Sequence, residues 1–116
     1  MLELKKEISA QHNFLLELQR VLESELYLIS TRDAESLINL LKTKEALLDS
    51  VQQQDTLIAS LHSKISQEQK DDEELVALFS QAKEMVTQCQ FRTKINQTEV
   101  TQVQLRLEHL RTLILC

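Results

Sequence analysis

Glycine and proline are both absent from this chain of 116 residues, and aromatic residues make up only 3% of it. Glycine supplies the positive φ angles that tight turns require, and proline punctuates loops. The sequence therefore argues against a sheet built from hairpins, and it excludes the glycine-rich loops that cradle phosphates. The residues used instead are chiefly Leu, Glu, Gln, Lys, Ala and Ser, most of which favour helices. We predict an all-α protein.

Charge and hydropathy exclude several classes of function. The formal net charge is −5, whereas nucleic acids and anionic membranes are bound by clustered Lys and Arg. No apolar run approaches the roughly 20 residues of a membrane span, and the N-terminus lacks the apolar stretch of a secretory signal. Two cysteines, Cys89 and Cys116, are too few for a disulfide framework. We expect a cytoplasmic protein with reduced thiols, no nucleic-acid partner and no membrane insertion.

Three helical segments are predicted, over residues 2–29, 33–66 and 71–115. The first has a three-sevenths apolar face, which is wide enough to contact more than one neighbour. The Ser and Thr side chains at residues 30 and 31 are suited to cap the second segment. Asp33 then places a negative charge at the start of that helix, where the helix dipole favours it. Residues 67–74 contain no apolar side chain and serve as the second connection. We expect residues 1–116 to form a single helical domain.

The third segment carries the clearest pattern in the chain. A 4-3 spacing, which is a heptad signal, relates Leu75, Phe79, Ala82, Val86, Cys89, Thr93, Asn96, Val100, Val103, Leu107, Leu110 and Ile114. The stripe is broad up to Cys89, and from Thr93 onward its flanks turn polar. The face therefore narrows to a seam that suits one partner helix. Asn96 within it is either a buried residue that sets the register or a solvent-facing amide.

Helix lengths predict how the segments fit together. At 1.5 Å per residue they measure about 42, 50 and 66 Å. If they fold up-down-up as an antiparallel, coiled-coil-like three-helix bundle, the third helix overruns the first turn by roughly 15 Å. This overrun, from about Leu105 onward, is apolar without an intramolecular partner, and exposed apolar stretches mark interaction sites. We therefore predict a partner-binding surface formed by Asn96, Val100, Val103, Leu107, Leu110, Leu113 and Ile114.

Each of these features has a plainer interpretation. The seam from Val100 to Ile114 would instead be ordinary core if it packs on the first or second segment. Cys89 at a d position is most simply a small core residue. The acidic run over residues 71–74 is most simply a solvated helix start, and a patch for a metal or a basic partner is the alternative.

The sequence gives no pattern for catalysis. Carboxylate-bridged metal sites in helical bundles use Glu-x-x-His pairs, but Ser9, Ala59 and Arg106 stand three residues before the three histidines. No cluster of Cys and His has zinc spacing. We expect a protein that is not an enzyme and that uses no cofactor and no metal.

Several stretches resemble the FlgN-type flagellar export chaperones, which are small, acidic helical proteins. In that family two leucine-rich helices flank a polar turn, and the third helix has an asparagine-centred segment followed by leucine heptads. The corresponding stretches here are Leu22–Leu26, Asp33–Leu37, Lys44–Leu48 and Arg92–Asn96, followed by Leu107 and Leu110.

The resemblance implies a function and a set of partners. Such chaperones bind the C-terminal helical segments of hook-associated proteins, which form the hook–filament junction. They prevent premature assembly and deliver these clients to the flagellar type III export apparatus. Binding through the C-terminal part of the long helix maps here onto Val100, Val103, Leu107, Leu110 and Ile114. We expect a monomer or a weak homodimer, and the alternative function is a self-associating coiled-coil scaffold or adaptor.

Overall fold

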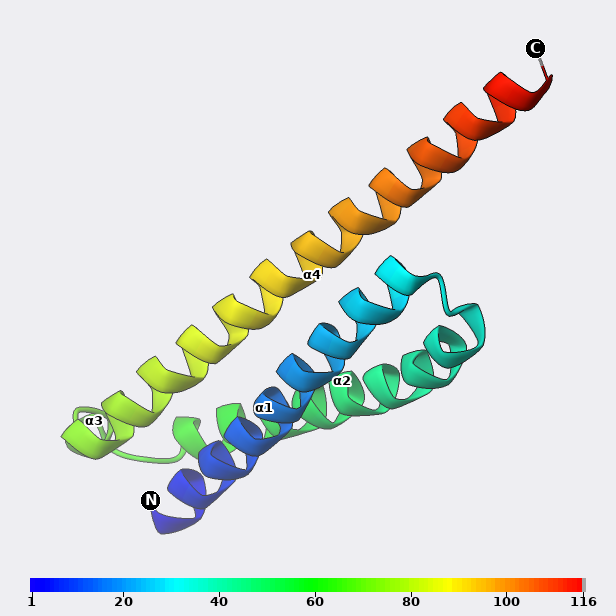
Figure 1. The fold of residues 1–116 in the computed structure, drawn as a ribbon. Coiled ribbons are helices and arrows are strands. Elements are labelled where there is room, and N and C mark those ends of the chain that lie inside the picture. Colours follow the sequence, from blue (N-terminus) through cyan, green and yellow to red (C-terminus); the bar gives the residue numbers. More distant parts are fainter. Residues whose placement is uncertain (116) are drawn as a thin grey trace.

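The structure is a computed structural model that describes residues 1–115, and helices are the only regular elements among them (Figure 1). The all-α prediction is therefore confirmed. Cys116, expected above to be a reduced thiol, lies outside the described residues. The four helices are α1 (Leu2–Thr31), α2 (Ala34–Ser63), α3 (Gln67–Lys70) and α4 (Glu73–Leu115). The three long helices begin and end within three residues of the predicted segments, and α3 is a single turn inside the predicted second connection.

The first connection turns without glycine. Arg32 ends α1 in the left-handed conformation at φ 57°, and its backbone N–H donates to Ile29 O. A non-glycine residue pays roughly 1–2 kcal/mol for this conformation. Asp33 then caps α2 by accepting the Ser36 N–H at 3.1 Å. The hydroxyl of Thr31, one of the expected caps, instead bonds back to Tyr27 O within α1.

The second connection is held by side-chain caps and by α1. Ser66 and Gln69 form a capping box at the start of α3, which satisfies two backbone donors reciprocally. Asp72 accepts the Leu75 N–H at 3.0 Å at the start of α4. Lys5 of α1 forms ion pairs with Asp72 at 3.2 Å and with Glu74 at 3.1 Å. The N-termini of α1 and α4 are thereby tied together.

Helix α1 is the element against which both α2 and α4 pack. Helix α2 runs opposite to α1, whereas α4 runs in the same direction as α1 (Figure 1). Buried residues from all three helices form two clusters along α1: Leu15, Leu18, Leu22, Leu47 and Cys89 in one, and Leu4, Ile8, Ile58 and Leu75 in the other. The arrangement is elongated, with extents of 70 × 22 × 17 Å.

The packing is more open than a closed bundle in which every helix touches both others. Extensive contacts join α1 to α2 and α1 to α4, but α2 and α4 pack far less on each other. The expected up-down-up order is thus combined with a gap along one side. Among residues 1–115, no helix combines the length and the apolar character needed to cross a bilayer.

Candidate partner-binding surface

The register of α1 against α4 shows where α4 loses its support. Cys89 Sγ donates to Leu15 O at 3.7 Å, and Asn96 Nδ2 donates to Leu22 O at 2.9 Å. Both pairs are separated by 74 positions. The same offset aligns Thr31, the last residue of α1, with residue 105. The residues of α4 that follow have no part of α1 beside them, and Figure 1 shows the helix continuing past the end of α1.

Four of the seven predicted partner-binding residues, Leu107, Leu110, Leu113 and Ile114, lie past residue 105, and Val100 and Val103 come shortly before it on the same stripe. We call them the terminal seam: Val100, Val103, Leu107, Leu110, Leu113 and Ile114. Val103 is half-buried, whereas Leu107, Leu110 and Ile114 expose 46%, 48% and 79% of their surface. The heptad stripe that is core at Leu75 is therefore uncovered at its far end. Fully burying a Leu side chain contributes about 1.5–3 kcal/mol, so covering the half-exposed seam would stabilise a complex by a fraction of that per residue.

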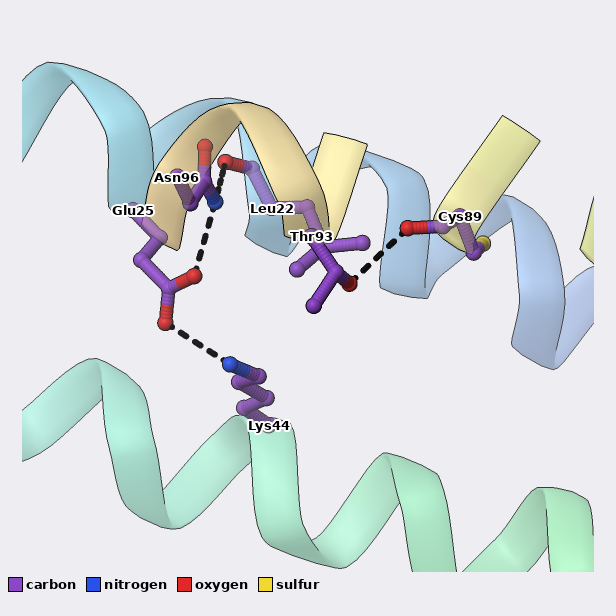
Figure 2. Close-up of polar contacts among 6 residues, drawn as sticks. All are labelled: Leu22, Glu25, Lys44, Cys89, Thr93 and Asn96. Atoms are coloured by element: carbon purple, nitrogen blue, oxygen red, sulfur yellow. Dashed lines mark hydrogen bonds and ion pairs between the residues drawn. The ribbon is translucent and has the colours of Figure 1, made fainter. Parts of the chain in front are cut away.

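Asn96, the seventh predicted residue, is placed differently. It is buried, and its amide Nδ2 donates to Leu22 O at 2.9 Å and to Glu25 Oε1 at 2.7 Å (Figure 2). The other carboxylate oxygen of Glu25 accepts from Lys44 Nζ at 3.0 Å. Of the two alternatives for Asn96, the structure shows the buried one, with its amide engaged inside the chain.

Glu25, Lys44 and Asn96 form what we call the polar layer. Its members come from α1, α2 and α4 in turn, so a chain of hydrogen bonds joins the three long helices (Figure 2). A buried amide that finds its partners in only one alignment favours that alignment over others. The polar layer therefore fixes how far α4 slides along α1, and with it the point at which the terminal seam begins.

A groove between α2 and α4 accompanies the seam. It consists of successive hollows of about 280, 500, 580 and 480 Å³, and neighbouring hollows share lining residues. Leu15 and Leu18 of α1 lie at its floor. The α2 wall includes Leu48, Val51 and Asp55, and the α4 wall includes Phe79, Lys83, Val86 and Lys94. We call this feature the α2/α4 groove.

The groove was not predicted from the sequence, although one signal pointed toward it. Helix α2 has a wider apolar face than contact with α1 alone requires, because Leu41 and Leu48 remain exposed while Leu47 is buried. A face of that width indicates a second neighbour. Periodicity alone does not say whether this neighbour is α4 or another molecule.

The remaining candidate groups are structural. Cys89 is buried in the core, and burial raises the pKa of its thiol, with Arg92 opposing the shift. A thiol with a raised pKa is a poor nucleophile. His12 Nε2 lies 3.1 Å from Leu78 O, and the ring of His62 packs edge-on against Phe79. Within residues 1–115, His, Cys, Asp and Glu side chains form no group of three or more that could hold a metal ion.

Comparisons with known proteins found no protein-family model, no curated protein and no solved structure that matches this chain.

Proposed function

We propose that the protein is a cytoplasmic export chaperone of the FlgN type, which binds the C-terminal helical segments of hook-associated proteins. One observation carries the proposal. The terminal seam continues the core heptad of α4 to the end of α1 and past it, and its Leu107, Leu110 and Ile114 side chains, which lie past that end, are uncovered. The resemblance of the sequence to that family supports the identity of the client.

The mechanism is helix pairing coupled to folding. A client segment that is disordered before binding lays an apolar face along the terminal seam and becomes helical there. Ordering that segment costs conformational entropy, so the affinity per buried area stays moderate. Moderate affinity suits a chaperone. Such a protein covers the apolar face of its client in the cytoplasm and then releases the client to the flagellar type III export apparatus.

The test is binding of a peptide from the C-terminal helical region of a hook-associated protein, measured by calorimetry and circular dichroism. The wild-type protein should bind it with a gain in helicity. Leu107→Asp combined with Leu110→Asp should abolish binding and leave the thermal melt nearly unchanged, since both side chains are about half exposed. The matched control is Ile38→Asp with Phe91→Asp, which places two carboxylates at exposed apolar positions outside the seam and the groove.

Sedimentation of the free protein separates the proposal from the second reading, a self-associating scaffold. A monomer or weak dimer that binds the client peptide supports the chaperone. A tight dimer that ignores the peptide and is broken by the same two seam substitutions would contradict it. A large loss of stability in the seam variant would show that these residues belong to the core.

A further inference from the structure

The α2/α4 groove has the shape of a vacant fourth position in a helical bundle. Two helices rest on α1 and leave a trough between them, with Leu15 and Leu18 at the bottom. Leu48 on one wall and Val86 on the other expose 45% and 38% of their surface. Four helices around a shared apolar core are a stable arrangement. One more helix, laid in this trough, would cover both walls at once.

The charged residues along the groove indicate which side chains that helix carries. Lys83 and Lys94 both line it from α4 and are 11 positions apart, which is about 16 Å along one edge of the helix. Neither forms an ion pair within the part of the chain that the structure describes. This basic edge stands out in a protein whose net charge is −5. A helix with acidic residues along the side that faces α4 would complement it.

The two walls differ in charge, which orients the incoming helix. Asp55 lines the groove from α2, in the same hollow to which Lys83 contributes from α4. Lys44, the basic residue on the α2 wall, is already paired with Glu25. An acidic edge is therefore favoured toward α4 and disfavoured toward Asp55.

One end of the groove runs into the terminal seam. The hollow at that end is lined by the three residues of the polar layer and by Val100, the first residue of the seam. A helix lying in the groove passes from there onto the uncovered part of α4. The groove and the seam thus form one continuous track, and a polar residue of the incoming helix would match the polar layer in register.

We propose that the α2/α4 groove is the seat of an amphipathic partner helix whose acidic edge lies along Lys83 and Lys94, completing a four-helix bundle. The inference deepens the proposed function and rests on it for one point, that the partner is a helical segment of another protein. It adds where that segment lies and which charge pattern it carries.

The test uses two synthetic peptides of about 21 residues, or three heptads. Both carry the same leucine stripe, and along one edge of that stripe one peptide has Glu where the other has Lys. Fluorescence anisotropy at low salt should show the Glu-edged peptide binding about tenfold more tightly. Lys83→Glu with Lys94→Glu should remove that preference, whereas Lys6→Glu with Lys64→Glu, at exposed positions outside the groove, should keep it.

A second pair of variants tests the groove without using charge. Val86→Trp fills the trough and should weaken binding of both peptides at least tenfold. Val76→Trp is the matched control, since Val76 is also an exposed valine on α4 but does not line the groove, and it should bind as the wild type does. Circular dichroism establishes that each variant is folded before binding is compared.

Three results would overturn the inference. One is equal affinity for the two peptides, and another is equal binding by the Val86→Trp and Val76→Trp variants. The third is a concentration-dependent dimer whose NMR spectrum shows Leu48 and Val86 already covered, which would assign the groove to a second copy of this chain. Because neither peptide contains client sequence, these failures differ from failure of a hook-associated peptide to bind the terminal seam.

Discussion

The two halves of α4 have the same heptad spacing, but the stripe is largely buried in the first half and largely exposed in the second. From Leu75 to Asn96 the stripe faces α1, and its a and d positions include the buried residues Leu75, Ala82 and Cys89. From Val100 to Ile114 the spacing continues, but the side chains are half-buried at most. For Leu107, Leu110 and Ile114 the difference lies in the neighbouring helix, because α1 ends level with residue 105. A heptad pattern therefore indicates that a helix packs against another helix. The lengths of the other helices decide whether that second helix belongs to the same chain.

Alanine substitution in each half gives the largest contrast. Leu75 is fully buried against Leu4, Ile8 and Ile58, so Leu75→Ala should lower the free energy of unfolding by about 2–5 kcal/mol. Leu110→Ala removes the same methyl groups from the exposed half and should change it by no more than about 0.5 kcal/mol. Urea denaturation followed by circular dichroism measures both. Similar losses for the two variants would mean that the seam is covered in the free protein.

The sequence predicted this contrast better than it predicted the contacts that produce it. Helix lengths alone placed the start of the overrun near Leu105, which is the residue that the α1 and α4 register aligns with Thr31. Absence of glycine and proline was enough for the helical class, and a cysteine at a d position was correctly interpreted as core. Each of these inferences depends on periodicity or length, which are properties of a single helix.

Features that depend on how helices are placed relative to one another escaped prediction. Ser30 and Thr31 were expected to cap α2, but α1 extends through Thr31 and Arg32 turns in the left-handed conformation, so Asp33 is the residue at the N-cap. Asn96 was assigned to partner binding, but Glu25 and the Leu22 carbonyl take up its amide. The α2/α4 groove results from the angles at which α2 and α4 sit on α1, and no spacing rule encodes those angles.

The polar layer lies at the boundary between the two halves of α4. A substitution of Asn96 therefore tests how much the polar layer contributes to stability. Asn96→Ala removes the amide group that donates to Leu22 O and to Glu25 Oε1, and acceptors left unsatisfied in this way cost about 1–3 kcal/mol. The matched control is Gln97→Ala, at the exposed neighbouring position, which should stay within about 0.5 kcal/mol of the wild type. Chemical denaturation of both variants checks the difference. Equal stabilities would show that register is set by the apolar contacts alone.

The smallest effect is expected at the other boundary of the anchored half, where α4 begins. The backbone N–H of Leu75 and the ammonium group of Lys5 lower the pKa of the Asp72 carboxyl below 3.8, and Glu74 and Asp72 raise the pKa of Lys5 above 10.5. A lowered carboxyl pKa stabilises the fold above the unfolded value and loses this effect as the pH falls through the folded value. A raised lysine pKa acts below 10.5 and is lost as the pH rises through the folded value. The charge interactions at this junction are therefore complete at neutral pH.

Asp72→Asn isolates the carboxylate charge, because an asparagine side chain can still accept the capping hydrogen bond from Leu75 N–H. Its melting temperature should lie slightly below that of the wild type at neutral pH, and the two should converge as the pH falls below 3.8. Thermal melts across an acid titration measure the gap, with Asp49→Asn, at an exposed position of α2, as the control. A gap that persists in acid would trace the loss to the cap geometry. Convergence would show that a charge contact from α1 stabilises the first turn of α4. At the other end of α4, α1 has already ended and, within residues 1–115, no residue of α1 contacts the last part of the seam.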